Sequence, residues 1–187
     1  MPETGRAAAL IDRVAGLSWR GRVLVLGVLG AVAALGQAPV GAWPLSILAF
    51  ALLYGVFLRA AGGRQAAWIG WAFGTGYFLL SLNWIIEPFL VDVARHGWMA
   101  PFALLGLSGG LALFAAAALG LGRSLGGGAL GFVGGLGLVE LARGYVLTGF
   151  PWAQPGHVLI DTPLLHWASY LGSLGLTALV LLAEYLR

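Results

Sequence analysis

Cysteine and lysine are both absent from this sequence, and acidic residues are few. Without cysteine the chain cannot form disulfides, thiolate nucleophiles or cysteine-based metal sites. Arginine supplies all the fixed positive charge of the side chains, and charged residues of both signs make up only 9% of the chain, against about a quarter of a typical soluble domain. Hydrophobic residues make up 60%, and the mean hydropathy is +0.92. This composition is typical of an integral membrane protein.

The arginines lie mostly at the ends of apolar runs. A high isoelectric point would suggest nucleic-acid binding in a soluble protein, but this distribution indicates membrane topology, and we expect no nucleic-acid partner. If the N-terminus is cytoplasmic, only Arg95 and Arg143 of the 10 cationic residues lie on the outer side. The positive-inside rule predicts such an asymmetry.

A helix needs about 20 mostly apolar residues to cross a bilayer. Segments that approach this length predict an all-α, polytopic transmembrane helix bundle of about six spans. The predicted spans are Val23–Ala38, Trp43–Leu58, Ala66–Ile86, Trp98–Leu121, Leu125–Leu147 and Pro163–Leu186. Residues 1–22 form a basic leader that we expect to be an interfacial helix on the cytoplasmic side. A turn containing proline and glycine, residues 37–41, joins the first two spans as a helical hairpin.

Glycines recur four residues apart on three of the predicted spans. They are Gly70 and Gly74, Gly106 and Gly110, and Gly127, Gly131 and Gly135. This spacing lets two helix backbones approach closely. We expect the contacts to lie within the bundle, with dimerisation as the alternative.

Three matches to functional motifs fail on their context. Residues 106–110 fit the G-x-S-x-G pattern, but they lie within an apolar helix, whereas a nucleophile elbow requires a strand-to-helix turn. Residues 122–128 resemble a phosphate-binding loop only in their glycine content. His96, His157 and His166 lack the spacing of metal ligands, so we expect no metal site.

Two pairs of polar residues lie near the predicted outer ends of spans. Asn83 and Glu87 close the third span, and Glu140 and Arg143 share one face of the fifth span. Ionisable residues inside a membrane need either a partner or a function. Mutual neutralisation with hydrogen bonding between helices is one interpretation, and a functional site is the other. Because both pairs lie on the same side, they favour a site at this surface over a channel through the bilayer.

A long motif continues from the second pair. Residues 140–154 read Glu-Leu-Ala-Arg-Gly-Tyr-Val-Leu-Thr-Gly-Phe-Pro-Trp-Ala-Gln, and residues 161–164 read Asp-Thr-Pro-Leu. This run resembles the signature of the apolipoprotein N-acyltransferase family. Residues 69–78, 83–85 and 43–45 are further matches, and the resemblance extends in order from about Arg22 to the end of the chain.

The resemblance implies an enzyme of the bacterial inner (cytoplasmic) membrane whose functional face is periplasmic. Family members transfer an acyl chain from a membrane phospholipid to the α-amino group of a lipoprotein's diacylglyceryl cysteine, through a thioester. The implied partners are therefore a phospholipid donor and a lipoprotein acceptor. The family's Glu-Lys-Cys triad lies in a nitrilase-like domain that follows a seventh span.

The sequence departs from this pattern because it contains neither cysteine nor lysine and stops at Arg187. We therefore expect a truncated membrane domain that is inactive alone and works with the missing nitrilase-like domain, although a split or degenerate protein is an alternative. We assign no catalytic residue, metal ligand or cofactor. The candidate substrate-binding or loop-supporting residues are Asn83, Trp84, Glu140, Arg143, Phe150, Trp152 and Gln154.

Other classes of membrane protein remain as alternatives. The chain would then be a non-enzymatic scaffold, a transporter, or a membrane partner of another lipid-processing enzyme. A transporter should show internal repeats and polar groups near the midplane from both halves. The sequence shows neither feature, since Glu87, Glu140 and Arg143 gather toward one predicted surface.

Overall fold

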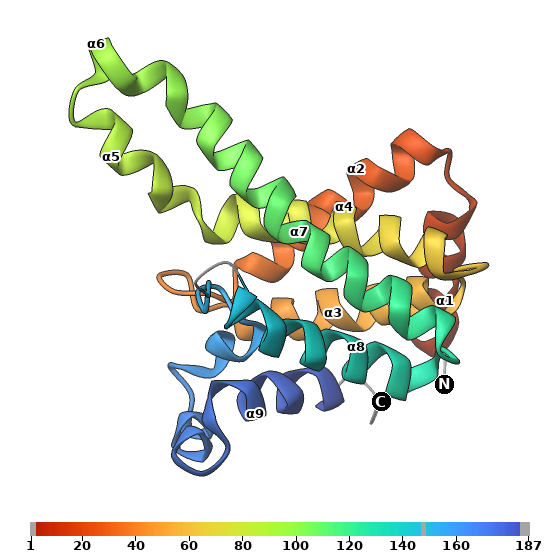
Figure 1. Cartoon of the computed structure of the whole chain (residues 1–187). Coiled ribbons are helices and arrows are strands. Elements are labelled where there is room, and N and C mark those ends of the chain that lie inside the picture. Colours follow the sequence, from red (N-terminus) through yellow and green to blue (C-terminus); the bar gives the residue numbers. More distant parts are fainter. Residues whose placement is uncertain (1–2, 147–148, 184–187) are drawn as a thin grey trace.

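The computed structural model describes residues 3–146 and 149–183, and over these residues it contains helices and turns but no strand (Figure 1). The predicted all-α fold class is confirmed. Some parts of the sequence predictions lie outside the described residues. These are the start of the leader, Thr148 of the motif, and the ends of the fifth and sixth predicted spans at Leu147 and Leu186.

Seven longer helices form the body of the described structure. They are α1 (Glu3–Gly16), α2 (Trp19–Ala34), α3 (Trp43–Leu58), α4 (Gly63–Ser81), α7 (Ala100–Ser124), α8 (Gly128–Arg143) and α9 (Ala168–Ala183). Between α4 and α7 lie η1 (Asn83–Ile86), α5 (Glu87–Leu90), α6 (Val93–His96) and η2 (Gly97–Met99). The connection from α8 to α9 contains the 3-10 helices η4 (Pro155–Leu159) and η5 (Pro163–Trp167).

The helices differ in whether they are long enough to cross a membrane. Two runs in the described residues, Val93–Ser124 with 32 residues and Pro163–Leu182 with 20 residues, are long and apolar enough. A third qualifies if α4 and Asn83–Leu90, which meet at a bend of 62°, form one broken span. Helix α3 is apolar but has only 16 residues. The count of six spans therefore stays a prediction.

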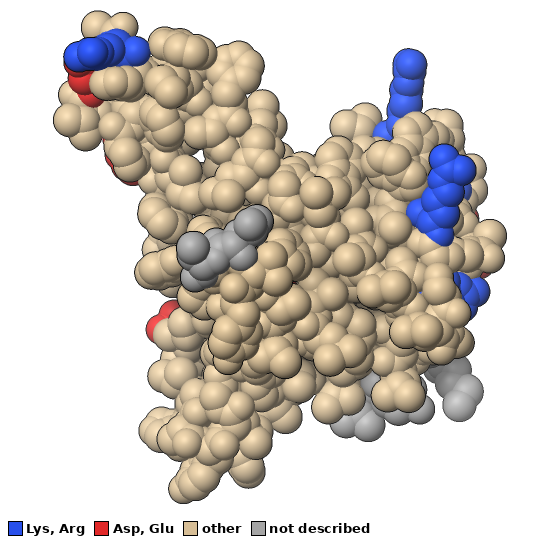
Figure 2. Space-filling model, viewed as in Figure 1, with Lys and Arg blue, Asp and Glu red and all other residues tan. Residues whose placement is uncertain are grey.

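The bundle has two ends that differ in structure. Figure 1 shows α1, the α3–α4 turn and the α7–α8 turn at one end, and the α8–α9 loop at the other. Helices α5 and α6 and the start of α7 project from the bundle as an arm (Figure 1). On the face drawn in Figure 2, arginine atoms lie at the tip of the arm and along the opposite edge, with a broad uncharged surface between them. This distribution suits a bundle whose middle lies in hydrocarbon.

Glycine brings helix backbones into contact at several crossings. A Cβ atom added to Gly70 on α4 would lie 2.3 Å from the carbonyl oxygen of Ala115 on α7. One added to Gly135 on α8 would lie 2.4 Å from the carbonyl oxygen of Ala118. The predicted packing within the bundle is found at these positions. The prediction is wrong for Gly106 and Gly110. No neighbouring atom lies within 4 Å of a Cβ atom added to either residue, because α7 turns a different face toward the bundle there.

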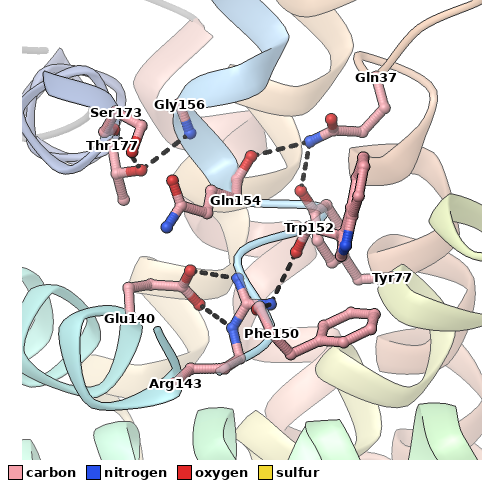
Figure 3. Close-up of polar contacts among 10 residues, drawn as sticks. All are labelled: Gln37, Tyr77, Glu140, Arg143, Phe150, Trp152, Gln154, Gly156, Ser173 and Thr177. Atoms are coloured by element: carbon pink, nitrogen blue, oxygen red, sulfur yellow. Dashed lines mark hydrogen bonds and ion pairs between the residues drawn. The ribbon is translucent and has the colours of Figure 1, made fainter. Parts of the chain in front are cut away.

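Aromatic rings fill the contact between α3 and α4. Phe50 lies 5.2 Å from Phe73 and 6.0 Å from Tyr77, measured between ring centroids. These tilted and edge-to-face geometries are the ones that aromatic pairs prefer. Tyr77 is buried, and its hydroxyl points toward the end of the bundle where the α8–α9 loop lies (Figure 3).

Candidate functional site

The centre of the candidate site is a buried ion pair at the end of α8. Arg143 is 1% exposed and Glu140 is 8% exposed. The Arg143 Nη2 atom lies 2.5 Å from Glu140 Oε2, and Nε donates to Oε1 at 3.3 Å. A spacing of three residues places both side chains on one helix face, and an arginine in the last turn also interacts favourably with the helix dipole.

The other side of the guanidinium holds the loop that follows the helix. Arg143 Nη1 donates hydrogen bonds of 2.7 Å to the backbone carbonyls of Phe150 and Trp152 (Figure 3). The Phe150 N–H donates back to the Arg143 carbonyl at 2.8 Å. The guanidinium carbon also lies 5.4 Å from the centroid of the Phe78 ring, within range of a cation–π interaction. We call residues 149–154 the clamped loop.

The backbone of the clamped loop is turned tightly. Gly149 has a φ of +84°, and a Cβ atom there would lie 2.3 Å from the Gly144 carbonyl oxygen. Ala153 has a φ of +54°, which is uncommon for a residue other than glycine. Such conformations persist where the surrounding contacts determine them, and Ala153 is buried. The loop therefore has a defined shape in which Trp152 points outward.

A second set of contacts anchors the far end of this loop. The Gln37 Nε2 atom donates to the Gln154 backbone carbonyl at 3.0 Å and to the Tyr77 hydroxyl at 2.5 Å (Figure 3). Gln154 itself is buried, and its Oε1 atom has no hydrogen-bond partner among the described residues. Gln37 thus ties the loop to the α2–α3 turn and, through Tyr77, links it to α4.

Helix η4 continues from the clamped loop and packs against α9. The Gly156 N–H donates to the Thr177 hydroxyl at 3.1 Å, and that hydroxyl donates to the Ser173 carbonyl at 3.1 Å (Figure 3). A Cβ atom at Gly156 would lie 2.5 Å from the backbone nitrogen of Thr177. Only glycine allows η4 and α9 to approach this closely.

Two indole rings meet at the surface beside the clamped loop. The rings of Trp84 and Trp152 lie 5.9 Å apart at an interplanar angle of 64°. Trp152 is 58% exposed and Trp84 is 49% exposed. This pair, which we call the indole pair, joins the clamped loop to η1. Amphipathic rings of this kind prefer the boundary between hydrocarbon and water.

The cavity beside the ion pair is too small for a substrate. Glu140 lines a cavity of about 30 Å³ whose other walls are mainly apolar. That volume corresponds to about one water molecule and cannot hold an acyl chain or a lipid headgroup. A ligand of that size therefore cannot occupy this cavity.

The structure brings together six of the seven residues that the sequence suggested. Glu140, Arg143, Phe150, Trp152, Gln154 and Trp84 are linked by the contacts described above. Asn83 is exposed at the start of η1, and no hydrogen bond of its side chain is found among the described residues. Over residues 3–146 and 149–183, histidine, aspartate and glutamate form no group of three or more that could hold a metal ion.

Gln37 and Tyr77 were not identified from the sequence. Gln37 is the only polar side chain in the turn between the first two predicted spans, and a lone amide in such a turn could have drawn attention to it. Tyr77 lies within the second stretch that resembles the family, residues 69–78. Neither the lone amide nor the family-like stretch predicts which contact the residue makes.

Near the loop, the imidazole of His157 is partly buried. Burial lowers the pKa of His157, and the positive charge of Arg143 lowers it further. The neutral form of this side chain is therefore favoured in the folded chain.

Comparison with known proteins matches the sequence of this chain to a protein family. Residues 29–186 match the apolipoprotein N-acyltransferase N-terminal domain. The chain is 41% identical over 171 residues to an apolipoprotein N-acyltransferase of Caulobacter vibrioides, a match that covers 87% of this chain and 32% of the relative. It is 36% identical over 186 residues to that of Rhizobium etli, covering 91% and 34%. It is also 36% identical over 189 residues to that of Brucella melitensis, covering 91% and 35%. The chain spans about a third of the length of these relatives, and the resemblance drawn from the motif is confirmed.

Proposed function

Because the chain belongs to the apolipoprotein N-acyltransferase N-terminal domain family, we propose that it is the membrane domain of an acyltransferase that modifies lipoproteins. In this role it supports transfer of an acyl chain from a membrane phospholipid to the N-terminal diacylglyceryl cysteine of a lipoprotein. The relatives that it matches are acyltransferases by name, and donor and acceptor are taken from the resemblance in the sequence. The observation that carries the proposed role is the clamped loop.

The clamped loop presents an amphipathic surface at a fixed position. Arg143 holds the carbonyls of Phe150 and Trp152, so the backbone on both sides of Pro151 is immobilised while the Trp152 ring stays exposed. The indole pair then lies at the end of the bundle, where the acyl tails of bound lipids would leave hydrocarbon. A lipidated substrate held at such a surface reacts with the thiolate, or in the second step with the thioester, as if at high effective concentration.

The covalent chemistry is proposed to come from outside these residues. A thioester intermediate requires a cysteine thiolate, and the sequence contains no cysteine and no lysine. We propose that the 187 residues alone do not transfer acyl groups, and that they serve as the membrane platform for a nitrilase-like domain. Within this platform Glu140 and Arg143 are positioning residues.

A fusion protein tests whether the chain serves as the membrane platform while another domain supplies the covalent chemistry. The chain alone and the chain joined to the remaining part of the Caulobacter vibrioides relative would be assayed for N-acylation of a diacylglyceryl peptide in phospholipid vesicles. We expect no turnover from the chain alone and turnover from the fusion. A fusion whose nucleophilic cysteine is replaced by serine is the control for background acylation. Turnover by the chain alone would contradict its proposed inactivity, and an inactive fusion that melts cooperatively would contradict the proposed function.

We further propose that the protein lies in the bacterial inner membrane with its N-terminus in the cytoplasm and the indole pair at the periplasmic face. The absence of cysteine makes this directly testable, because a single introduced thiol has no background. In spheroplasts, a membrane-impermeant maleimide should label Trp152→Cys, and it should label Arg64→Cys only after permeabilisation. The reverse pattern would invert the proposed topology.

A further inference from the structure

A large cavity lies at the opposite end of the bundle from the clamped loop. Its volume is about 770 Å³, and its lining includes Trp19, Arg22, Gly62, Arg64, Gln65 and Trp68. These residues come from the start of α2, the α3–α4 turn and the start of α4. Because α4 rises about 1.5 Å per residue, Arg64 lies roughly 20 Å along the helix axis from Tyr77 and the loop contacts. The cavity is therefore separate from the candidate functional site.

Among the described residues, no carboxylate balances the positive charge at this cavity. The two ion pairs found among the described residues involve other arginines, so no carboxylate pairs with Arg22 or Arg64. Arg22 donates through Nη2 to the carbonyls of Ala15 and Leu17, and its buried Nε has no acceptor in the part of the chain that the structure describes. Arg64 is exposed. Two guanidinium groups beside one cavity favour an anionic ligand, and phosphate matches their donor geometry.

An amide adds a further donor to the same wall. Gln65 Oε1 accepts a 2.7 Å hydrogen bond from the Ala61 N–H in the α3–α4 turn. This bond occupies the oxygen of the side-chain amide and leaves its Nε2 group as a donor. Together with the arginines it places three donor side chains in the lining, which suits the oxygens of a phosphodiester.

Next to the donors lies an apolar surface. Trp19 and Trp68 meet edge to face with ring centroids 5.0 Å apart, and both are about half exposed. A second, almost wholly apolar cavity of about 390 Å³ shares Arg64 and Trp68 with the first and continues between α4 and α7 along Trp71 and Leu113. An open hollow edged by two guanidinium groups, which continues into an apolar groove, suits a lipid with a charged headgroup and an acyl chain.

We propose that these two cavities bind an anionic phospholipid, with its phosphate against Arg22 and Arg64 and an acyl chain in the groove between α4 and α7. This lipid lies at the arginine-rich end of the bundle, far from the indole pair. It is therefore distinct from the acyl donor of the proposed reaction, and the site does not depend on that function. A lipid held there joins α2, α4 and α7 at this membrane surface.

Titration of the purified chain in a non-ionic detergent tests the site. Native mass spectrometry would measure binding of phosphatidylglycerol, phosphatidylcholine and inorganic phosphate, with the melting temperature as a second readout. We expect phosphatidylglycerol to bind more tightly than phosphatidylcholine. Arg64→Gln should weaken phosphatidylglycerol binding about fivefold, because one basic residue near an anionic lipid contributes on that scale.

A matched control distinguishes the site from general attraction by positive charge. Arg20 is an exposed arginine in the same turn of α2 as Trp19, but it does not line either cavity. Arg20→Gln should change phosphatidylglycerol binding less than twofold, and Trp68→Leu should weaken it without changing the charge. Equal effects of Arg20→Gln and Arg64→Gln would overturn the site. Inorganic phosphate that competes fully with the lipid at millimolar concentration would overturn the lipid assignment in favour of a free anion.

Discussion

Gln37 and Gln154 lie 117 positions apart in the chain, and the side-chain amide of Gln37 donates a 3.0 Å hydrogen bond to the backbone carbonyl of Gln154. The same nitrogen donates to the Tyr77 hydroxyl. The contact therefore ties the α2–α3 turn and α4 to the loop that follows α8. With Arg143 at its other end, the clamped loop is held from two directions. This double attachment gives the exposed indole of Trp152 a fixed position.

Replacing Gln37 by leucine should loosen the loop. The change removes both hydrogen bonds and leaves the Gln154 carbonyl and the Tyr77 hydroxyl without their donor, which costs about 1–3 kcal/mol of the free energy of unfolding. Amide hydrogen exchange at residues 149–154 should accelerate in the variant. Asn83→Leu changes an exposed amide and should shift stability by no more than about 0.5 kcal/mol. Equal exchange in both variants would mean that the Gln37 contact does not hold the loop.

Removing Arg143 should cost more than neutralising its partner. Arg143→Met leaves the Glu140 carboxylate and two loop carbonyls without a donor, and breaking a buried pair in this way costs about 3–5 kcal/mol. Glu140→Gln keeps the arginine and its bonds to the loop, so we expect a loss of about 1–3 kcal/mol. Unfolding in detergent micelles by heat or by an ionic denaturant would rank the two variants. The opposite ranking would show that the loop bonds of Arg143 contribute little.

Two glycine substitutions should have effects of opposite sign. Gly156→Ala places a Cβ atom 2.5 Å from the Thr177 nitrogen and so must push η4 away from α9, at a cost of about 1–3 kcal/mol. Gly134 lies within α8 with no atom within 4 Å of an added Cβ. Gly134→Ala should stabilise the helix by up to about 1 kcal/mol, because alanine has the higher helix propensity. Melting temperatures of the two variants measure the contrast, and a fall of the same size in both would contradict it.

The pKa of His157 predicts a dependence of stability on pH. Its folded-state pKa is lowered, chiefly by burial and also by Arg143, so the unfolded chain takes up the proton at a higher pH than the folded chain. Its contribution to the free energy of unfolding is complete above the ordinary pKa of about 6.5 and decreases as the pH falls from there toward the folded-state pKa. His157→Gln should remove this decrease, whereas His96→Gln, at an exposed position of α6, should keep it. Identical pH profiles for the native chain and His157→Gln would contradict the assignment.

The sequence predicted those features that local spacing determines. Apolar runs predicted helices throughout, and the spacing of Glu140 and Arg143 predicted that the two side chains would meet on one face of a helix. The glycine spacing predicted close backbone contacts, which occur at Gly70 and Gly135 but not at Gly106. That difference depends on which face of α7 turns inward, and a spacing of four residues does not determine it.

Contacts between distant segments could not be predicted in the same way. The bond from Gln37 to Gln154 depends on how the α2–α3 turn packs against the α8–α9 loop, and neither segment carries a repeating pattern. The positive φ of Ala153 is set by its neighbours, since alanine alone does not favour it. The 62° bend after α4 likewise lies within a segment that is apolar on both sides of the bend, so the hydropathy did not predict it.

In the proposed function, Arg143 positions the clamped loop for catalysis. The direct measurement is kcat/KM for N-acylation of a diacylglyceryl peptide by the active fusion, with Arg143→Met compared with Arg95→Met, which changes an arginine outside the loop contacts. We expect Arg143→Met to lower kcat/KM by at least about tenfold, equivalent to about 1.4 kcal/mol, and Arg95→Met to lower it less than twofold. Full activity in a folded Arg143→Met fusion would contradict the claim.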